Sequence, residues 1–131
     1  MEIELPFRNS TVLDAILVTV RVNGKDAVLI FDTGSNRTIL SPQFADYDSR
    51  DRTKFQTMFP ESTVKAEARW GRVTLQIAGQ TWKNRQVVVK SQDDVSRVFG
   101  QKIDGILGKD VLNEFGRVTI DFPSHLIRLS Q

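Results

Sequence analysis

The chain has 131 residues, a length that suits one domain, residues 1–131, around a single hydrophobic core. Hydrophobic residues make up 40% and charged residues 26%, which is typical of a folded protein and unlike a disordered one. The 18 basic and 16 acidic residues are spread along the chain, so no basic tract indicates nucleic-acid binding. Because there is no cysteine, disulfide scaffolds, thiolate zinc sites and cysteine nucleophiles are excluded.

The start of the chain, Met1 to Pro6, lacks the charged and then apolar pattern of a signal peptide. No apolar run approaches the length of a membrane span, so we expect no membrane-spanning segment and leave the compartment open. His125 is the only histidine, which excludes a multi-histidine metal site. We expect neither a metal nor an organic cofactor.

Strand patterns dominate the chain. β-Branched runs at 15–22 and 25–31 flank Asn23-Gly24, a pair typical of a type I′ hairpin turn. A final hairpin is expected across Pro123-Ser124-His125, with His125 exposed in the turn. The remaining strand patterns lie at 53–59, 64–77, 81–89, 118–122 and 126–129.

Helix patterns are few and short. Ser41-Pro42 offers an N-cap followed by a proline at the first helical position, and Lys109 to Phe115 can form two turns that Gly116 stops. The polar stretch Ser91 to Lys102 resembles a surface excursion. Together the elements predict a mainly antiparallel β domain, a small closed barrel or a folded sheet, with one or two short helices.

The segment Leu29 to Ser35 carries the chemistry, because an apolar strand runs into Asp32-Thr33-Gly34-Ser35. A carboxylate at the end of a buried strand is costly unless hydrogen bonds or proton sharing compensate. Thr33 and Ser35 supply hydroxyls, and Gly34 allows a tight turn that brings backbone N–H groups towards Asp32. An isolated Asp-Thr-Gly is more often an ordinary turn carboxylate, so the surrounding sequence has to decide between the two readings.

Two such carboxylates about 3 Å apart cannot both ionise and hold one proton jointly, for which aspartic proteases are the standard example. One then acts as base towards a bound water and the other as acid towards the oxyanion.

A second segment, Ile103 to Gly108, follows later and precedes the short helix at Lys109 to Phe115. With both segments in this order, residues 15–129 resemble the retropepsin-like aspartic proteases, including single-lobe bacterial members. That resemblance implies the retropepsin-like acid protease fold and hydrolysis of peptide bonds in peptide or protein substrates.

The resemblance also implies residue roles. Asp32 would be the catalytic aspartate, the Thr33 hydroxyl would lock two active-site loops together, and Gly34 would shape the loop. Ser35 would hydrogen-bond the outer aspartate oxygen. Substrate contacts are implied for the wall residues Ile106 and Leu107, for Gly108 beside the catalytic loop, and for the tip of a covering hairpin, or flap, at Pro60, Glu61 and Ser62, which contains no glycine.

Only one such Asp motif is present, since Asp104-Gly105 lacks the intervening hydroxyl residue, and we expect a structural hydrogen-bonding role for Asp104. A homodimer would supply the second Asp32 across a two-fold axis; a second lobe on a longer chain would serve equally. The alternative function is a non-catalytic peptide-binding or dimerisation module with the same fold. Trp70 and Trp82 are expected in the core.

Overall fold

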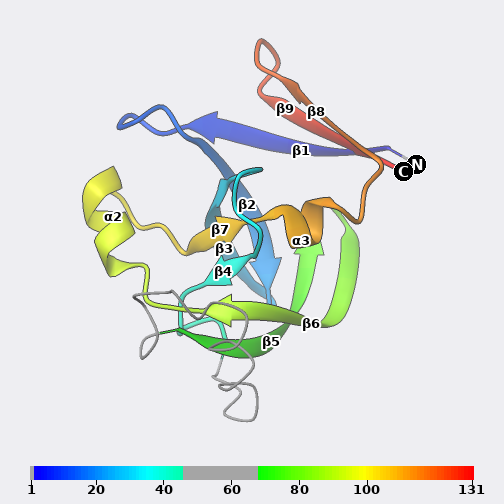
Figure 1. Ribbon diagram of the computed structural model, residues 1–131. Helices are drawn as coiled ribbons and strands as arrows, with labels where there is room; N and C mark the ends of the chain where they lie inside the picture. Colours follow the sequence, from blue (N-terminus) through cyan, green and yellow to red (C-terminus); the bar gives the residue numbers. More distant parts are fainter. Residues whose placement is uncertain (1, 46–67) are drawn as a thin grey trace.

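The computed structural model describes residues 2–45 and 68–131, which form mostly β-strands (Figure 1). Two short helices, α2 (Asp93–Phe99) and α3 (Lys109–Leu112), accompany them in the described ranges. The strands are β1 (Glu2–Asn9), β2 (Ile16–Val22), β3 (Lys25–Phe31), β4 (Ile39–Leu40), β5 (Arg69–Ile77), β6 (Gln80–Val89), β7 (Gly105–Leu107), β8 (Arg117–Asp121) and β9 (Leu126–Ser130).

Six of these strands close into a barrel. Their order is β3-β7-β4-β6-β5-β2, and the β2–β3 hairpin pairing joins the two ends. The predicted mainly β closed barrel is therefore confirmed. Most pairings are antiparallel, but β3–β7 and β4–β6 are parallel. In both parallel pairs a long stretch of chain that contains other strands separates the two partners, so neither pair is a tight hairpin.

The β2–β3 hairpin forms as its sequence predicts. Asn23 and Gly24 have φ angles of 50° and 81°, the left-handed values that a type I′ turn requires at both central positions. Along β3 the buried residues alternate with more accessible ones up to Phe31. One face of this strand is therefore buried in the core, and this burial fixes the position of Phe31 at the end of the strand.

A terminal sheet, β1-β9-β8, extends from the barrel through the pairing of β1 with β2 (Figure 1). One face of this sheet is apolar and joins the main core. On the other face Arg128 meets Glu2, Glu4 and Asp121. The hydrogen bond from Arg128, with that from the Ser124 backbone, holds the pKa of Asp121 below its ordinary value.

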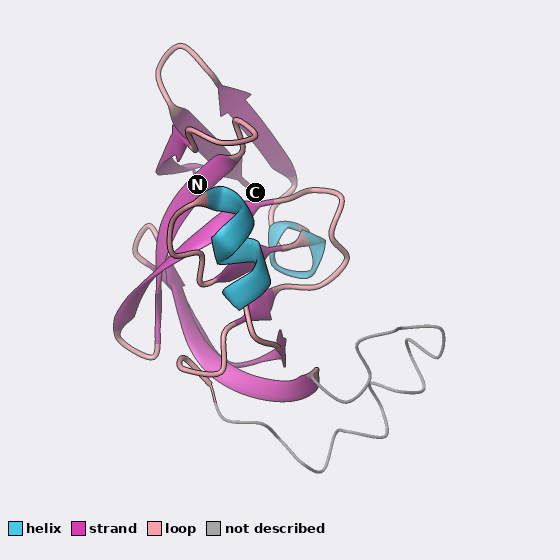
Figure 2. Ribbon diagram, turned by 90° about the vertical axis from the view of Figure 1, so that its left-hand side faces the viewer, coloured by secondary structure: helices cyan, strands magenta, loops and turns pink. Residues whose placement is uncertain are grey.

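The main core fills the barrel and continues under the terminal sheet. As expected, Trp70 is buried and Trp82 packs at the core, edge-on to Phe115 with ring centroids 5.8 Å apart. A second cluster forms where Phe99 of α2 covers Leu17 and Ile103 on the outside of the barrel. Figure 2 shows α2 lying in front of the strands on this side.

Several local predictions differ from the structure. Residues 42–44 form a turn and not a helix, with one bond from Phe44 N–H to the Ser41 carbonyl. The segment 91–102, expected as a surface excursion, contains α2, a helix that the sequence analysis did not predict and that ends at Gly100 with a φ of 65°. Helix α3 is shorter than predicted and continues as turns to Phe115. The predicted strand at 53–59 lies outside the described residues.

In the described ranges, no helix is long and apolar enough to cross a membrane. Nor do three or more His, Asp or Glu side chains gather there in a group that could hold a metal ion. His125 is exposed in the β8–β9 turn, as predicted.

The contact between β7 and its neighbours generates a stability prediction. A Cβ on Gly105 would overlap the carbonyl oxygen of Ile39 and lie 3.1 Å from Leu29 Cδ2, so Gly105→Ala must push two strands apart. We expect the free energy of unfolding in urea to fall by about 3 kcal/mol. Gly116→Ala is the control, since its nearest neighbour is Gln131 at 3.3 Å near the chain end, and it should cost less than about 1 kcal/mol. Equal losses in the two variants would contradict this account of β7.

Candidate active site

Asp32 is the first residue after β3, and the neighbouring strand β7 fixes its backbone. β3 and β7 run parallel, with Phe31 beside Leu107, and the Asp32 N–H donates to the Leu107 carbonyl at 3.1 Å. β7 is also paired with β4, so it lies between the strands that enter and leave the Asp32 loop. The main chain at Asp32 is therefore held from the barrel side.

The Asp32 carboxylate is partly buried and is held at one oxygen. Gly34 N–H donates to Oδ1 at 2.8 Å, and Ser35 N–H donates to the Asp32 carbonyl at 3.2 Å. In the described part of the chain no group hydrogen-bonds to the other oxygen, Oδ2. This tight turn is the one that the Asp-Thr-Gly-Ser pattern predicts, and it leaves Oδ2 free of hydrogen bonds from the described residues.

Ser35 contacts a different partner from the one implied by the resemblance. Its hydroxyl donates to the Arg37 carbonyl at 2.8 Å, and a hydroxyl has one hydrogen to give, so in this protomer Ser35 does not donate to Asp32. The Ser35 carbonyl accepts the Lys109 N–H at 2.8 Å. Ser35 thus ties the Asp32 loop to the start of α3.

Gly108 lies where the loop and α3 meet. A Cβ on Gly108 would be 2.6 Å from the Arg37 carbonyl and 3.0 Å from the Ser35 oxygen, so only glycine fits against the loop. The expectation that Gly108 leaves room beside the catalytic loop matches this packing. A contact with substrate remains a proposal for this residue.

Thr38 and Asp110, which the sequence analysis did not single out, complete the junction. The buried Thr38 donates from its N–H (2.9 Å) and its hydroxyl (2.7 Å) to Asp110 Oδ1. The same hydroxyl accepts the Gly108 N–H at 3.0 Å. These bonds join positions 70 and 72 residues apart, and no local pattern indicates such a pairing.

The other expected site residues divide by exposure. Thr33 and Gly34 are exposed, and Ile106 is partly buried between Ile30 and Ile39. Leu107 is completely buried in the core, which leaves Ile106 as the wall residue with accessible surface. The expected flap tip, Pro60, Glu61 and Ser62, lies outside the described residues.

Asp104 has the structural role that we expected. It is buried, and its Oδ2 accepts the Val28 N–H at 2.8 Å while Gln43 donates to Oδ1 at 3.2 Å.

Arg37 is a charged residue near the Asp32 loop. Its guanidinium lies 5.3 Å from the centroid of the Trp70 ring, a distance at which a cation–π interaction is favourable.

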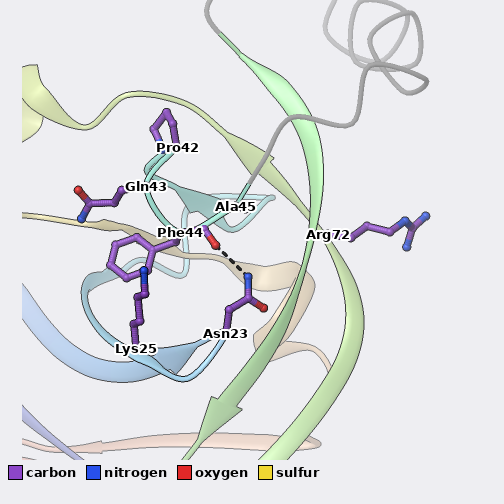
Figure 3. Close-up of a pocket in the computed structure, with 7 residues that line it drawn as sticks. All are labelled: Asn23, Lys25, Pro42, Gln43, Phe44, Ala45 and Arg72. Carbon is purple, nitrogen blue, oxygen red and sulfur yellow. Dashed lines mark hydrogen bonds between the residues drawn. The ribbon is translucent and has the colours of Figure 1, made fainter.

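A separate pocket of about 420 Å³ lies near the start of β3 (Figure 3). Lys25, Phe44 and Arg72 are among the residues that line it, and Asn23 donates to the Phe44 carbonyl at 2.9 Å. β3 separates this pocket from Asp32 by seven residues, or about 20 Å. The pocket is therefore not part of the Asp32 site.

The Thr38 junction can be tested directly. Thr38→Val keeps the shape of the side chain but leaves the Gly108 N–H without its acceptor and removes one donor from Asp110. We expect the free energy of unfolding to fall by about 2 kcal/mol. Thr19→Val, at an exposed strand threonine, should change it by less than about 0.5 kcal/mol. If urea titrations gave the two variants the same midpoint, the junction would have no measurable role.

Comparisons with known proteins agree with this geometry. The Aspartyl protease family matches residues 18–111, which include the Asp32 loop, β7 and the start of α3. No curated protein sequence matches the chain.

Among solved structures, a retropepsin-like aspartic protease from Rickettsia conorii is similar with a TM-score of 0.60 and 21% identity, covering 98% of this chain and 90% of that one. The retroviral protease-like domain of Ddi1 from Leishmania major has a TM-score of 0.50 and 15% identity, with 86% and 90% covered. EIAV protease in complex with the inhibitor HBY-793 has a TM-score of 0.47 and 13% identity, with 79% and 90% covered. The barrel is thus the retropepsin-like fold, and the chain belongs to the Aspartyl protease family.

Proposed function

We propose that this chain is an aspartic endopeptidase, active as a homodimer in which each protomer contributes Asp32. The observation that carries the proposal is the carboxylate itself. One of its oxygens is held by Gly34 N–H, and the other has no hydrogen-bond partner within residues 2–45 and 68–131. A lone carboxylate in this position can accept a proton but cannot supply one at the same time, so the chemistry needs a second carboxyl group.

In the proposed reaction two Asp32 side chains share one proton. The ionised carboxylate takes a proton from a water molecule as that water attacks the scissile carbonyl carbon, and the protonated carboxyl gives its proton to the developing oxyanion. Collapse of the tetrahedral intermediate breaks the C–N bond, and the leaving nitrogen receives a proton. Backbone hydrogen bonds fix the Asp32 loop before the substrate binds, so little conformational entropy of the loop is lost during the reaction.

Three further roles belong to this proposal. Thr33 is exposed beside Asp32 and would contact the same loop of the partner subunit. Gly34 would keep the turn tight. Ile106 and Gly108 would form the wall beside the substrate, and Pro60, Glu61 and Ser62 would form the cover. The partner that this arrangement accepts is an extended peptide segment.

Replacement of the carboxylate tests the reaction. Asp32→Asn keeps an oxygen that can accept the Gly34 N–H, so the fold should be retained, but an amide can be neither general base nor general acid. We expect cleavage of a mixed peptide library to fall by about 100-fold to 10,000-fold. Asp26→Asn, an exposed carboxylate on the same strand, should cleave as the wild type does. A dimeric wild type that cleaves nothing from acidic to neutral pH would favour the non-catalytic module.

The pH dependence tests the shared proton. A pair that works with one proton between two carboxyls loses activity when both are protonated at low pH and when both are ionised at higher pH. We therefore expect a bell-shaped profile of kcat/KM with its maximum on the acidic side of neutrality. Peptide cleavage should be followed by mass spectrometry across the pH range over which circular dichroism shows a folded chain. A rate that rises steadily into alkaline pH would rule out this mechanism.

A further inference from the structure

Five apolar residues from five neighbouring strands form a row on the outer face of the barrel wall. Each member pairs with the next, in the order Ile30, Ile106, Ile39, Val88 and Trp70. Their neighbours in the sequence, which include Leu29, Leu40 and Leu107, point the other way into the main core. Side chains of paired residues lie on the same face of a sheet, so the row is continuous, and its three isoleucines are only partly buried.

Asp32 and Arg37 lie on the same face as this row. Side chains alternate along an extended chain, so Asp32, two residues after Ile30, faces the same way as Ile30. Arg37 precedes Ile39 by two residues, and the 5.3 Å contact between its guanidinium and the Trp70 ring places it on this face independently. Because only β7 separates β3 from β4, two strand spacings put the two charged residues on the order of 10 Å apart.

Contacts at both its side chain and its main chain hold Arg37 in place. Its guanidinium lies over the ring of Trp70, a side chain that is only 1% exposed, and its carbonyl accepts the Ser35 hydroxyl at 2.8 Å. A guanidinium presents five N–H donors in a planar fork that matches the two oxygens of a carboxylate, and it can bind one while it keeps other bonds. Arg37 is therefore a preformed binding group for a carboxylate beside Asp32.

We propose that Arg37 makes the Asp32 site selective for substrates with an acidic side chain within three residues of the scissile bond. The inference rests on the proposed function and names the substrate class of that site. An extended peptide advances about 3.4 Å per residue, so three residues span the distance between Asp32 and Arg37. Apolar side chains of the same segment pack on Ile30, Ile106 and Ile39, and in a homodimer the two-fold axis repeats this arrangement on the other side of the bond.

The charge of the Asp32 pair does not cancel this preference. Two carboxyls that share one proton carry one negative charge, which repels an acidic side chain. At about 10 Å, roughly one Debye length in 0.1 M salt, that repulsion is weakened by screening, whereas the contact with Arg37 is direct and charge-assisted. A lysine at the same position of the substrate meets the Arg37 cation instead. The expected order of preference is therefore glutamate, then glutamine, then lysine.

Matched peptides test the preference on the wild-type protein. The probes share a central Leu-Phe bond and carry one Glu, Gln or Lys at the second or third residue on either side of it. At about pH 5.5 a peptide glutamate, with an ordinary pKa of about 4.3, is mostly ionised. At the best position the Glu peptide should therefore have a kcat/KM about tenfold or more above that of the Gln peptide. Equal rates for the Glu and Gln peptides at every position would overturn the proposal.

Replacement of the guanidinium assigns the preference to Arg37. Arg37→Gln keeps the backbone carbonyl that accepts the Ser35 hydroxyl, so the loop should stay in place, but the ratio of the Glu to the Gln rate should fall to within about twofold. Arg37→Glu should reverse the order, so that the Lys peptide is cleaved fastest. Arg21→Gln, at an exposed arginine of β2, is the control and should keep the wild-type ratio. A folded Arg37→Gln variant with the full preference for Glu would contradict the assignment.

Peptide binding separates this inference from the proposed protease activity. Cleavage of the Glu and Gln peptides at the same rate would overturn the Arg37 preference and leave the protease function standing. If the wild type cleaves neither, the fluorescence anisotropy of labelled peptides decides. A Kd about tenfold lower for the Glu peptide than for the Gln peptide, with equal values in Arg37→Gln, would support the Arg37 preference and count against proteolysis. Equal Kd values in the wild type would overturn the preference.

Discussion

The insertion of β7 between β3 and β4 is the constraint on which the candidate site depends. β7 has only three residues, yet it pairs in parallel with the strand that enters the Asp32 loop and in antiparallel with the strand that leaves it. Such close packing of three backbones needs glycine at Gly105 and Gly108, where a Cβ would meet main-chain atoms. The position of the Asp32 carboxylate is thus set by packing of the main chain, which is more rigid than a contact between long side chains.

Most polar groups in this junction are satisfied within the protomer, but among the described residues Oδ2 of Asp32 and the buried Oδ2 of Asp110 have no hydrogen-bond partner. Backbone donors and acceptors around Ser35, Thr38 and Gly108 bond to each other and to Asp110, so few of them need water. The Asp32 carboxylate instead receives a single bond to one oxygen. Because the backbone of the Asp32 loop is already hydrogen-bonded, little of the main chain around this carboxylate must rearrange when a ligand binds.

Sequence patterns predicted the parts of this structure that local chemistry determines. The Asn23-Gly24 turn and the Asp32 turn need particular residues at particular positions, and both could be read directly. β4 and β7 could not be predicted, since two and three residues are too few to show a period. The bonds between Thr38 and Asp110 span 72 residues and depend on tertiary packing. β1 was not predicted although its residues alternate between exposed and buried. Pro6 holds one of the exposed positions, and a proline in a sequence argues against a strand.

Helix α3 connects the Asp32 loop to the terminal sheet. Its first N–H binds the Asp32 loop through Ser35, Asp110 binds Thr38, and Arg85 of the barrel holds Glu114 at 2.5 Å just beyond its end. The chain then passes Gly116 and becomes the free edge strand β8. Because α3 is bonded to the loop at its start and to the barrel just beyond its end, the Asp32 loop and the entry to β8 are held in a fixed relation.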